Sequence, residues 1–154
     1  MNLKVGNKFP DFKLSDDNEE IYHLYKDGNT SFLVLYFYPK DETPGCTKQA
    51  CYFKDYYDEF KEIDCEIIGI SSDNETSHRS FKTNYNLPFK LLCDHHSKLR
   101  KEIQLPKDFF GLSPGRITFL LNSKNEILFI HKSSLKMKSH IKKVLDFLNE
   151  IVLV

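Results

Sequence analysis

The chain has 154 residues, with 22 Lys and Arg, 22 Asp and Glu and a formal net charge of zero. It therefore lacks the basic excess of a nucleic-acid binder. Its length suits a single domain, residues 1–154, and is short for two. No apolar run approaches the roughly 20 residues that cross a bilayer, and the first residues lack the apolar stretch of a signal peptide. We therefore expect a cytoplasmic protein without a membrane partner. In that reducing compartment its four cysteines are reactive or simply buried, and do not form a disulfide framework.

The first half of the chain predicts a hairpin, a buried strand and a helix. Two short strands, at 12–14 and 21–24, flank a polar turn. The run FLVLYFY at 32–38 reads as a buried strand. A helix follows, because Thr43 is a preferred N-cap and Pro44 a preferred first helical residue. Spacings of four and three predict one apolar stripe along this helix, made by Cys46, Ala50, Phe53, Tyr57 and Phe60.

The second half of the chain alternates strands and helices and then adds a hairpin and a helix. The predicted elements are strand 65–71, helix 76–85, strand 88–94, helix 97–103, an irregular segment 104–115, an antiparallel hairpin of strands 116–121 and 126–131, and helix 138–151. His78 is expected on a solvated helix face. The order of elements predicts an α/β fold with a mixed sheet, compatible with a thioredoxin-like architecture but not specific to it.

Cys46 is the candidate nucleophile, in the first turn of a helix that directly follows a buried strand. Unpaired backbone N–H groups and the positive end of the helix dipole favour the thiolate, the nucleophilic form of cysteine. Thr43 can cap the helix or offer its hydroxyl to a bound oxyanion, and we favour the second role. Pro39 ends the strand, lacks an N–H and shields the pocket. A lone cysteine at a helix start is more often an ordinary small residue, and it is the conjunction with these neighbours that favours a reactive thiol.

Cys51 follows Cys46 by five residues in the same predicted helix. Five helical residues correspond to about 140° of rotation and about 7.5 Å of rise. A disulfide needs Cα atoms within about 7 Å and converging Cβ vectors, so the intact helix forbids one. If these two residues form a disulfide, the first turns must unwind. The site would then have a folded state with a poised thiolate and a locally unfolded state in which the sulfurs meet.

The string YFYPKDETPGCTKQAC carries the Pro-x-x-x-Thr-x-x-Cys signature and resembles the peroxiredoxins, thiol peroxidases of thioredoxin-like fold. The second cysteine, five positions on, is similar to that of the peroxiredoxin Q branch, also called bacterioferritin comigratory protein. The resemblance covers roughly residues 5–150 and includes GISSDNETSHRSFKTNYNLPFKLLCD and GRITFLLN. It implies an α/β, thioredoxin-like fold with a central mixed β-sheet flanked by helices and an N-terminal β-hairpin.

The resemblance also implies a thioredoxin-dependent peroxidase that acts on hydrogen peroxide and organic hydroperoxides. Cys46 would be oxidised to a sulfenic acid, Cys51 would resolve it to an intramolecular disulfide, and thioredoxin or a similar dithiol would reduce that disulfide. Pro39 and Thr43 carry over as pocket residues. Arg116 carries over as the guanidinium that favours the Cys46 thiolate and binds the peroxide oxygens. No metal or organic cofactor is implied, and we expect a monomer or at most a weak dimer.

Three positions depart from the branch. Gln49 stands where Glu is usual, which puts in doubt a carboxylate contribution to orienting the arginine. Lys54 stands where Arg is common, and Cys93 where a small hydroxyl residue is more frequent. We expect Cys65 and Cys93 to be buried and unreactive.

Two other functions stay open on the residues alone: a general thiol–disulfide oxidoreductase, or a redox sensor on the same scaffold. The absence of Cys-x-x-Cys and the presence of Thr43 and Arg116 argue against the first. A sensor would show slow oxidation of Cys46. The pair His95-His96 beside Asp94 invites a metal hypothesis, but adjacent residues rarely bind one ion together, so no metal site is expected.

Overall fold

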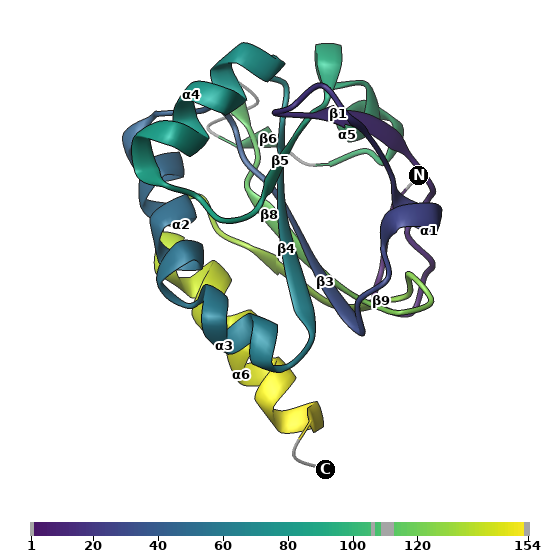
Figure 1. The fold of residues 1–154 in the computed structure, drawn as a ribbon. Coiled ribbons are helices and arrows are strands. Elements are labelled where there is room, and N and C mark those ends of the chain that lie inside the picture. Colours follow the sequence, from purple (N-terminus) through teal and green to yellow (C-terminus); the bar gives the residue numbers. More distant parts are fainter. Residues whose placement is uncertain (1, 106, 109–112, 153–154) are drawn as a thin grey trace.

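A seven-stranded mixed sheet forms the centre of the computed structural model, which describes residues 2–105, 107–108 and 113–152. The strands run across the sheet in the order β2-β1-β5-β4-β3-β8-β9 (Figure 1). Strands β3, β4 and β5 are parallel, and the other neighbours in the sheet are antiparallel. Their bounds are β1 (Lys13–Asp16), β2 (Ile21–His23), β3 (Phe32–Phe37), β4 (Cys65–Ser71), β5 (Lys90–Cys93), β8 (Ile117–Asn122) and β9 (Ile127–Lys132).

Helices cover both faces of this sheet. The long helices α2, α3, α4 and α6 lie on one side, and α1, α5 and the N-terminal segment lie on the other (Figure 1). The remaining elements are α1 (Leu24–Asp27), α2 (Pro44–Asp55), α3 (Tyr57–Glu62), α4 (Glu75–Tyr85), the 3₁₀ turn η1 (His95–Ser97), α5 (Lys98–Glu102), a separate pair of two-residue strands β6 (Lys107–Asp108) and β7 (Ser113–Pro114), and α6 (Met137–Val152). None of the helices within the described ranges is long and apolar enough to cross a membrane.

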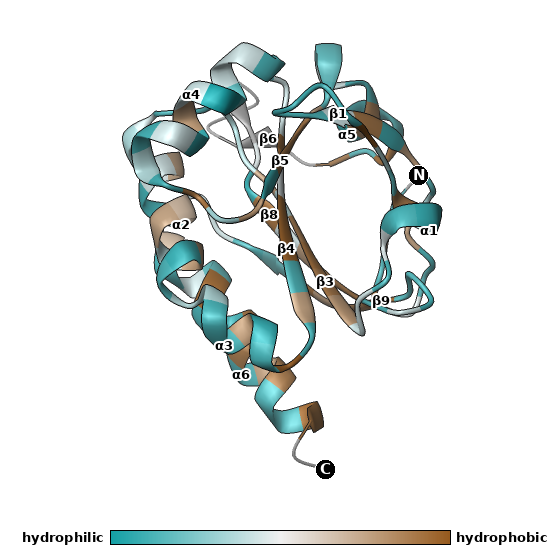
Figure 2. Cartoon of the chain, in the orientation of Figure 1, coloured by the Kyte–Doolittle hydropathy of each residue, from teal (hydrophilic) through white to brown (hydrophobic). Residues whose placement is uncertain are grey.

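Strand β3 shows why both faces of the sheet are apolar. Successive side chains of a strand point to opposite faces. Val34 and Tyr36 pack with Cys46 and the residues of the long helices, whereas Leu33 and Leu35 pack with the N-terminal segment and α5. Figure 2 shows the resulting apolar sheet between helices whose outer surfaces are hydrophilic. The continuous apolar run of β3 is typical of a central strand that is buried on both faces.

The predicted hairpins, the mixed sheet and the helices that flank it are confirmed, with local differences. Leu24, predicted at the end of a strand, instead begins α1. The helix predicted to run through Phe60 is interrupted at Tyr56, whose φ of −105° and ψ of 9° leave helical values. After this break α3 turns toward β4, where the Tyr57 hydroxyl donates to Glu66 at 3.0 Å. The segment predicted to be irregular holds β6 and β7, and its residues 106 and 109–112 lie outside the described part.

The expectation that His78 is solvated is wrong, because its side chain is fully buried between α4 and the sheet. Nδ1 lies 2.6 Å from an Asp41 carboxylate oxygen, and Nε2 lies 2.9 Å from the Leu92 carbonyl oxygen. Both acceptors require ring N–H groups, so the ring is an imidazolium. Burial alone lowers the pKa of His78, but the hydrogen bond to Asp41 and the neighbouring Cys93 outweigh it and raise the pKa from 6.5 to about 10. Sequence periodicity missed this histidine because its partner comes from a distant loop.

The raised pKa of His78 predicts that the protein loses stability as pH rises. A folded-state pKa above the unfolded value of 6.5 adds stability that is complete below pH 6.5 and is lost as pH rises through about 10. Urea unfolding across this range should show a falling free energy of unfolding for the wild type and a flatter profile for His78→Gln. His96→Gln, an exposed site, serves as the matched control. Equal slopes for the wild type and His78→Gln would contradict the assignment.

Candidate active site

Cys46 is the third residue of α2 and its side chain is only 1% exposed. Thr43 occupies the N-cap position and Pro44 the first helical position, as predicted. The Thr43 hydroxyl does not cap the helix, and donates to the Lys40 carbonyl oxygen at 2.9 Å instead. The buried sulfur therefore lies in the first turn, at the positive end of the helix dipole.

Arg116 lies beside Cys46 although 70 residues separate them in sequence. Its Nη1 is 3.3 Å from the Cys46 Sγ, and its side chain is 8% exposed. The antiparallel pairing of β3 with β8 explains the approach. Phe37 at the end of β3 faces Ile117 at the start of β8, so the residue before β8 reaches the loop that leads into α2. The buried Arg116 guanidinium therefore donates directly to this sulfur.

Gln49, one turn after Cys46, holds the same guanidinium. Its Oε1 accepts from Arg116 Nη1 at 2.7 Å, and its side chain is fully buried. The acceptor at this contact is thus a neutral amide oxygen, at the position where the family resemblance led us to expect a glutamate. Because the amide carries no charge, the positive charge of Arg116 is not neutralised at this contact.

Three buried polar atoms around Cys46 have no hydrogen-bond partner within the described ranges: Tyr36 Oη, Gln49 Nε2 and Arg116 Nε. Tyr36 and Cys46 belong to one buried cluster, and burial is the main cause that raises the pKa of Tyr36 well above its usual value. All three groups are hydrogen-bond donors. Buried donors are normally paired, so unpaired ones mark a place where a small ligand with acceptor oxygens can bind. Sequence analysis did not identify Tyr36. Alternation along β3 could have indicated it, because Tyr36 points to the same face of the sheet as α2 and α6.

The other predicted site residues flank this centre. Pro39 is half-buried directly after β3, in the loop that leads to Thr43. Cys51 is partly exposed in α2, and burial raises the pKa of its thiol. Both Cys46 and Cys51 are free thiols, and α2 is continuous through them from Pro44 to Asp55. The helix therefore holds the two sulfurs in the separated arrangement.

Helix α6 closes the site from the other side. A Cβ atom added at Gly45 would lie 2.9 Å from Met137 Cε and 3.2 Å from Arg116 Nη2, so a larger residue would displace the ends of these two side chains. Behind the arginine, the Thr118 hydroxyl lies 2.8 Å from His140 Nδ1. Burial is the main cause that lowers the pKa of His140, to about 4. At neutral pH this histidine is uncharged and adds no second cation beside Arg116. Sequence analysis had not singled out His140.

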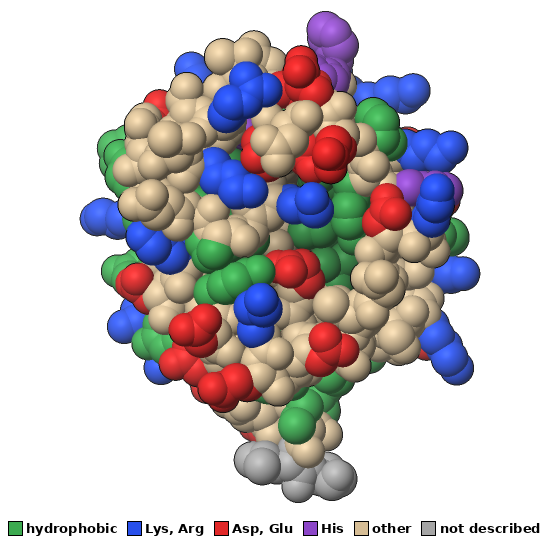
Figure 3. All heavy atoms as spheres, viewed as in Figure 1, with side chains coloured by type: hydrophobic (Ala, Val, Ile, Leu, Met, Phe, Trp, Pro, Cys, Tyr) green, Lys and Arg blue, Asp and Glu red, His purple; other side chains and the backbone are tan. Residues whose placement is uncertain are grey.

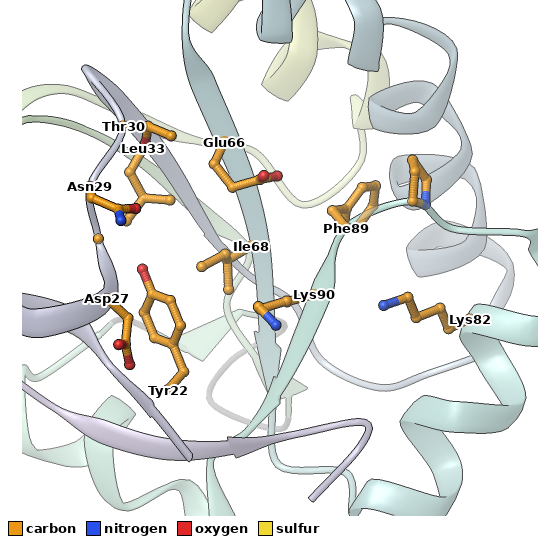
Figure 4. A pocket seen from close by; sticks show the side chains of 12 residues that line it. Tyr22, Asp27, Asn29, Thr30, Leu33, Glu66, Ile68, Lys82, Phe89 and Lys90 are labelled. Carbon is orange, nitrogen blue, oxygen red and sulfur yellow. The ribbon is translucent and has the colours of Figure 1, made fainter. Parts of the chain in front are cut away.

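A pocket of about 340 Å³ lies elsewhere, between the hairpin and strands β4 and β5 (Figure 4). Tyr22, Glu66 and Lys90 line it together with residues of the segment between α1 and β3. Cys46 and Arg116 do not line this pocket. Its size therefore says nothing about the thiol site, which needs space only for a small molecule.

The fold and the thiol centre together define a peroxiredoxin-class thiol peroxidase. The sequence pattern of the AhpC/TSA family matches residues 5–130. Peroxiredoxin Q of Arabidopsis thaliana, described as chloroplastic, is 45% identical over 146 residues, which covers 95% of this chain and 67% of that protein. Chloroplastic peroxiredoxin Q of Triticum aestivum is 42% identical over 149 residues, 97% of this chain and 68% of that protein.

Solved structures agree with these sequence relatives. Peroxidoxin BcpB from Mycobacterium tuberculosis superposes with a TM-score of 0.89 at 30% identity, covering 97% of this chain and 99% of that one. Peroxiredoxin Q from Xanthomonas campestris gives 0.81 at 30% identity, with 90% of each chain covered. The chain therefore belongs to the AhpC/TSA family and, within it, to the peroxiredoxin Q branch. The predicted thioredoxin-like fold and the predicted peroxidase function, typically by an intramolecular disulfide that thioredoxin recycles, are confirmed.

The contact between Gln49 and Arg116 predicts that this side chain needs an acceptor oxygen but no charge. In Gln49→Leu the guanidinium loses its acceptor, a loss of about 1.5–3 kcal/mol for a hydrogen bond to a charged group. If the whole loss appears in the transition state, oxidation slows roughly ten- to a hundredfold. In Gln49→Glu an acceptor remains, and oxidation should stay within about threefold of wild type. Stopped-flow oxidation by hydrogen peroxide measures both variants. Equal rates for Gln49→Leu and wild type would show that the contact does not position Arg116.

Proposed function

We propose that Cys46 is the peroxidatic cysteine and Cys51 the resolving cysteine of this peroxidase. The observation that supports this most directly is the Arg116 guanidinium 3.3 Å from a buried sulfur at the start of α2. The Cys46 thiolate attacks one oxygen of a hydroperoxide, and the O–O bond breaks. The sulfur becomes a sulfenic acid, and the other oxygen takes up a proton and leaves as water or an alcohol.

In this proposal Arg116 acts on both the nucleophile and the substrate. Its charge favours the thiolate, and its planar fork of N–H groups fits the oxygens of the peroxide, where negative charge develops as the O–O bond breaks. Arg116 Nε has no other partner within the described residues and is a donor for that role. Thr43 and Pro39 line the entrance: Thr43 offers its hydroxyl oxygen to the substrate, and Pro39 excludes water without adding an N–H that would compete.

Resolution requires a change of structure. The Cys51 thiol condenses with the sulfenic acid, a disulfide forms and water leaves. In the continuous helix the two residues are separated by about 7.5 Å of rise and about 140° of rotation, so the first turns of α2 must unwind. Thioredoxin or a similar dithiol then reduces the disulfide by thiol–disulfide exchange.

We further propose that the protein acts as a monomer in the cytoplasm. Exposed large apolar side chains are spread over separate elements of the described chain and do not build one patch, at Val5, Ile21, Tyr25, Tyr85, Leu135, Ile151 and Val152. The face in Figure 3 likewise shows mixed charges and only small apolar areas. A reducing compartment keeps the four thiols in the free state in which catalysis begins.

Rapid mixing of the fully reduced protein with hydrogen peroxide, followed by intact mass, tests the assignment of the two cysteines. We expect fast oxidation of the wild type that ends in the loss of two hydrogens. Cys46→Ser should abolish the fast reaction, whereas Cys51→Ser should still react once and then stop at a sulfenic or over-oxidised cysteine. Cys65→Ser, which removes a buried thiol with a raised pKa, is the matched control and should behave as wild type. Fast oxidation in Cys46→Ser, or a disulfide in Cys51→Ser, would overturn the assignment.

A further inference from the structure

Three potential metal ligands from separate segments meet at one edge of the sheet: Glu75, Cys93 and His95. Glu75 begins α4, Cys93 ends β5, and His95 begins the turn after it. One ligand atom of each lies within 4.8 Å of the others. The carboxyl ends of parallel strands β4 and β5 bring these segments together, at the edge where α/β sheets commonly bind ligands. Figure 3 shows histidine side chains projecting near acidic ones at the upper end of the molecule.

The spacing of these atoms fits a tetrahedral zinc ion. Zn–N and Zn–O bonds of about 2.0–2.1 Å at a tetrahedral angle separate the two ligand atoms by about 3.3 Å. His95 Nε2 and a Glu75 carboxylate oxygen are 3.2 Å apart, in a hydrogen bond that the ion would replace. A thiolate at about 2.3 Å from the ion requires the Cys93 sulfur to lie roughly 3.6 Å from each of them. The three ligand atoms lie within 4.8 Å of one another, so the sulfur is at most about 1.2 Å farther from each of the other two than zinc binding requires.

The surroundings supply a group that orients Glu75, and a pocket lies nearby. The Ser15 hydroxyl donates to the Glu75 carboxylate at 2.5 Å and fixes its orientation, as second-shell groups do at metal sites. A pocket of about 370 Å³ opens here, and its lining includes Ser15, Cys93 and His95. The Cys93 sulfur itself is fully buried, so an ion reaches it only when the side chains that cover it move.

The neighbouring polar groups are already engaged and do not compete for the ion. Asp94 receives hydrogen bonds from the Leu99 and Arg100 backbone N–H groups and serves as a cap for α5. A second group of potential ligands, Asp41, Asp73 and His78, also lies close together. In that group both His78 nitrogens already donate, so none is a free ligand.

We propose that Glu75, Cys93 and His95 form a binding site for a borderline-soft divalent cation, with Zn²⁺ as the ion that this donor set fits. Thiolate, imidazole and carboxylate are the usual zinc ligands in proteins. On binding, Cys93 releases its proton to solvent, His95 binds through its neutral Nε2, and water completes the tetrahedron. The site is independent of Cys46, and it requires a cysteine at a position where related sequences more often have a small hydroxyl residue.

Binding at Cys93 also reaches the active-site loop through one buried residue. Cys93 is next to His78, which is hydrogen-bonded to Asp41 in the loop between β3 and α2. The same Asp41 carboxylate accepts from the Tyr38 hydroxyl at 2.5 Å and from the Ser77 hydroxyl at 2.9 Å. The proposed ion would connect β5 to α4, and α4 contacts the loop before Cys46 through His78 and Asp41.

Titration of the reduced protein with Co²⁺, a spectroscopic substitute for Zn²⁺, tests the site directly. We expect one Co²⁺ per chain, visible bands of tetrahedral cobalt and a thiolate-to-metal charge-transfer band, all displaced by added Zn²⁺. Cys93→Ser should remove the charge-transfer band, and His95→Ala should weaken Zn²⁺ binding by more than about tenfold. His95 is exposed, so this second variant does not endanger folding. Matched controls are His96→Ala, the next exposed histidine, and the double variant Cys46→Ser, Cys51→Ser, both of which should bind as wild type.

Two results would overturn the proposal. Binding without a charge-transfer band would mean that no thiolate binds the ion. A band that persists in Cys93→Ser and disappears in the Cys46→Ser, Cys51→Ser variant would assign the ion to the peroxidase thiols.

Discussion

A buried sulfur held against a buried guanidinium is the contact on which the rest of this structure depends. Burying a charge is costly unless it is hydrogen-bonded, and the buried Arg116 guanidinium donates to the Cys46 sulfur and to the Gln49 amide oxygen. The pairing of β3 with β8 brings the arginine to the helix start, and the amide oxygen of Gln49 fixes its direction. Gly45 leaves space for the Met137 and Arg116 side chains. His140 is uncharged at neutral pH and therefore adds no second positive charge beside the arginine. The strand pairing and these side chains together define the contact between Arg116 Nη1 and the Cys46 sulfur.

Helix α2 places Cys46 beside Arg116 and at the same time holds it apart from Cys51. Cys46, Ala50 and Phe53 anchor α2 in the core, and α2 packs closely on α6. Unwinding its first turns must therefore expose apolar surface and break the contact between Arg116 and Cys46. The break at Tyr56 limits this cost, because α3 is a separate helix that packs on β4 and can stay in place. Local unfolding is then confined to the 12 residues of α2 or fewer.

The sequence predicted those parts of the protein that local patterns determine. The apolar run of β3, the cap and proline of α2 and the period of α6 each identify an element and its buried face. Cys46 could be proposed from its position between strand and helix. Contacts made across the sheet could not: the arginine 70 residues away was known only from a family resemblance. His78 was misplaced for the same reason, because its partner Asp41 comes from a loop 37 positions earlier. The period of a sequence indicates which face of a helix is polar. It does not distinguish a buried histidine with hydrogen-bond partners from a solvated one.

The central claim is that disulfide formation and an intact α2 exclude each other. Amide hydrogen exchange over residues 43–53, compared between the reduced and the peroxide-oxidised protein, tests it most directly. We predict strong protection of the amides of residues 47–53, whose N–H groups are bonded within the helix, loss of that protection on oxidation, and unchanged exchange in α6. In Cys51→Ser, which cannot form the disulfide, protection should survive oxidation. Equal protection of residues 43–53 in a protein whose Cys46–Cys51 disulfide is verified by mass would contradict the account.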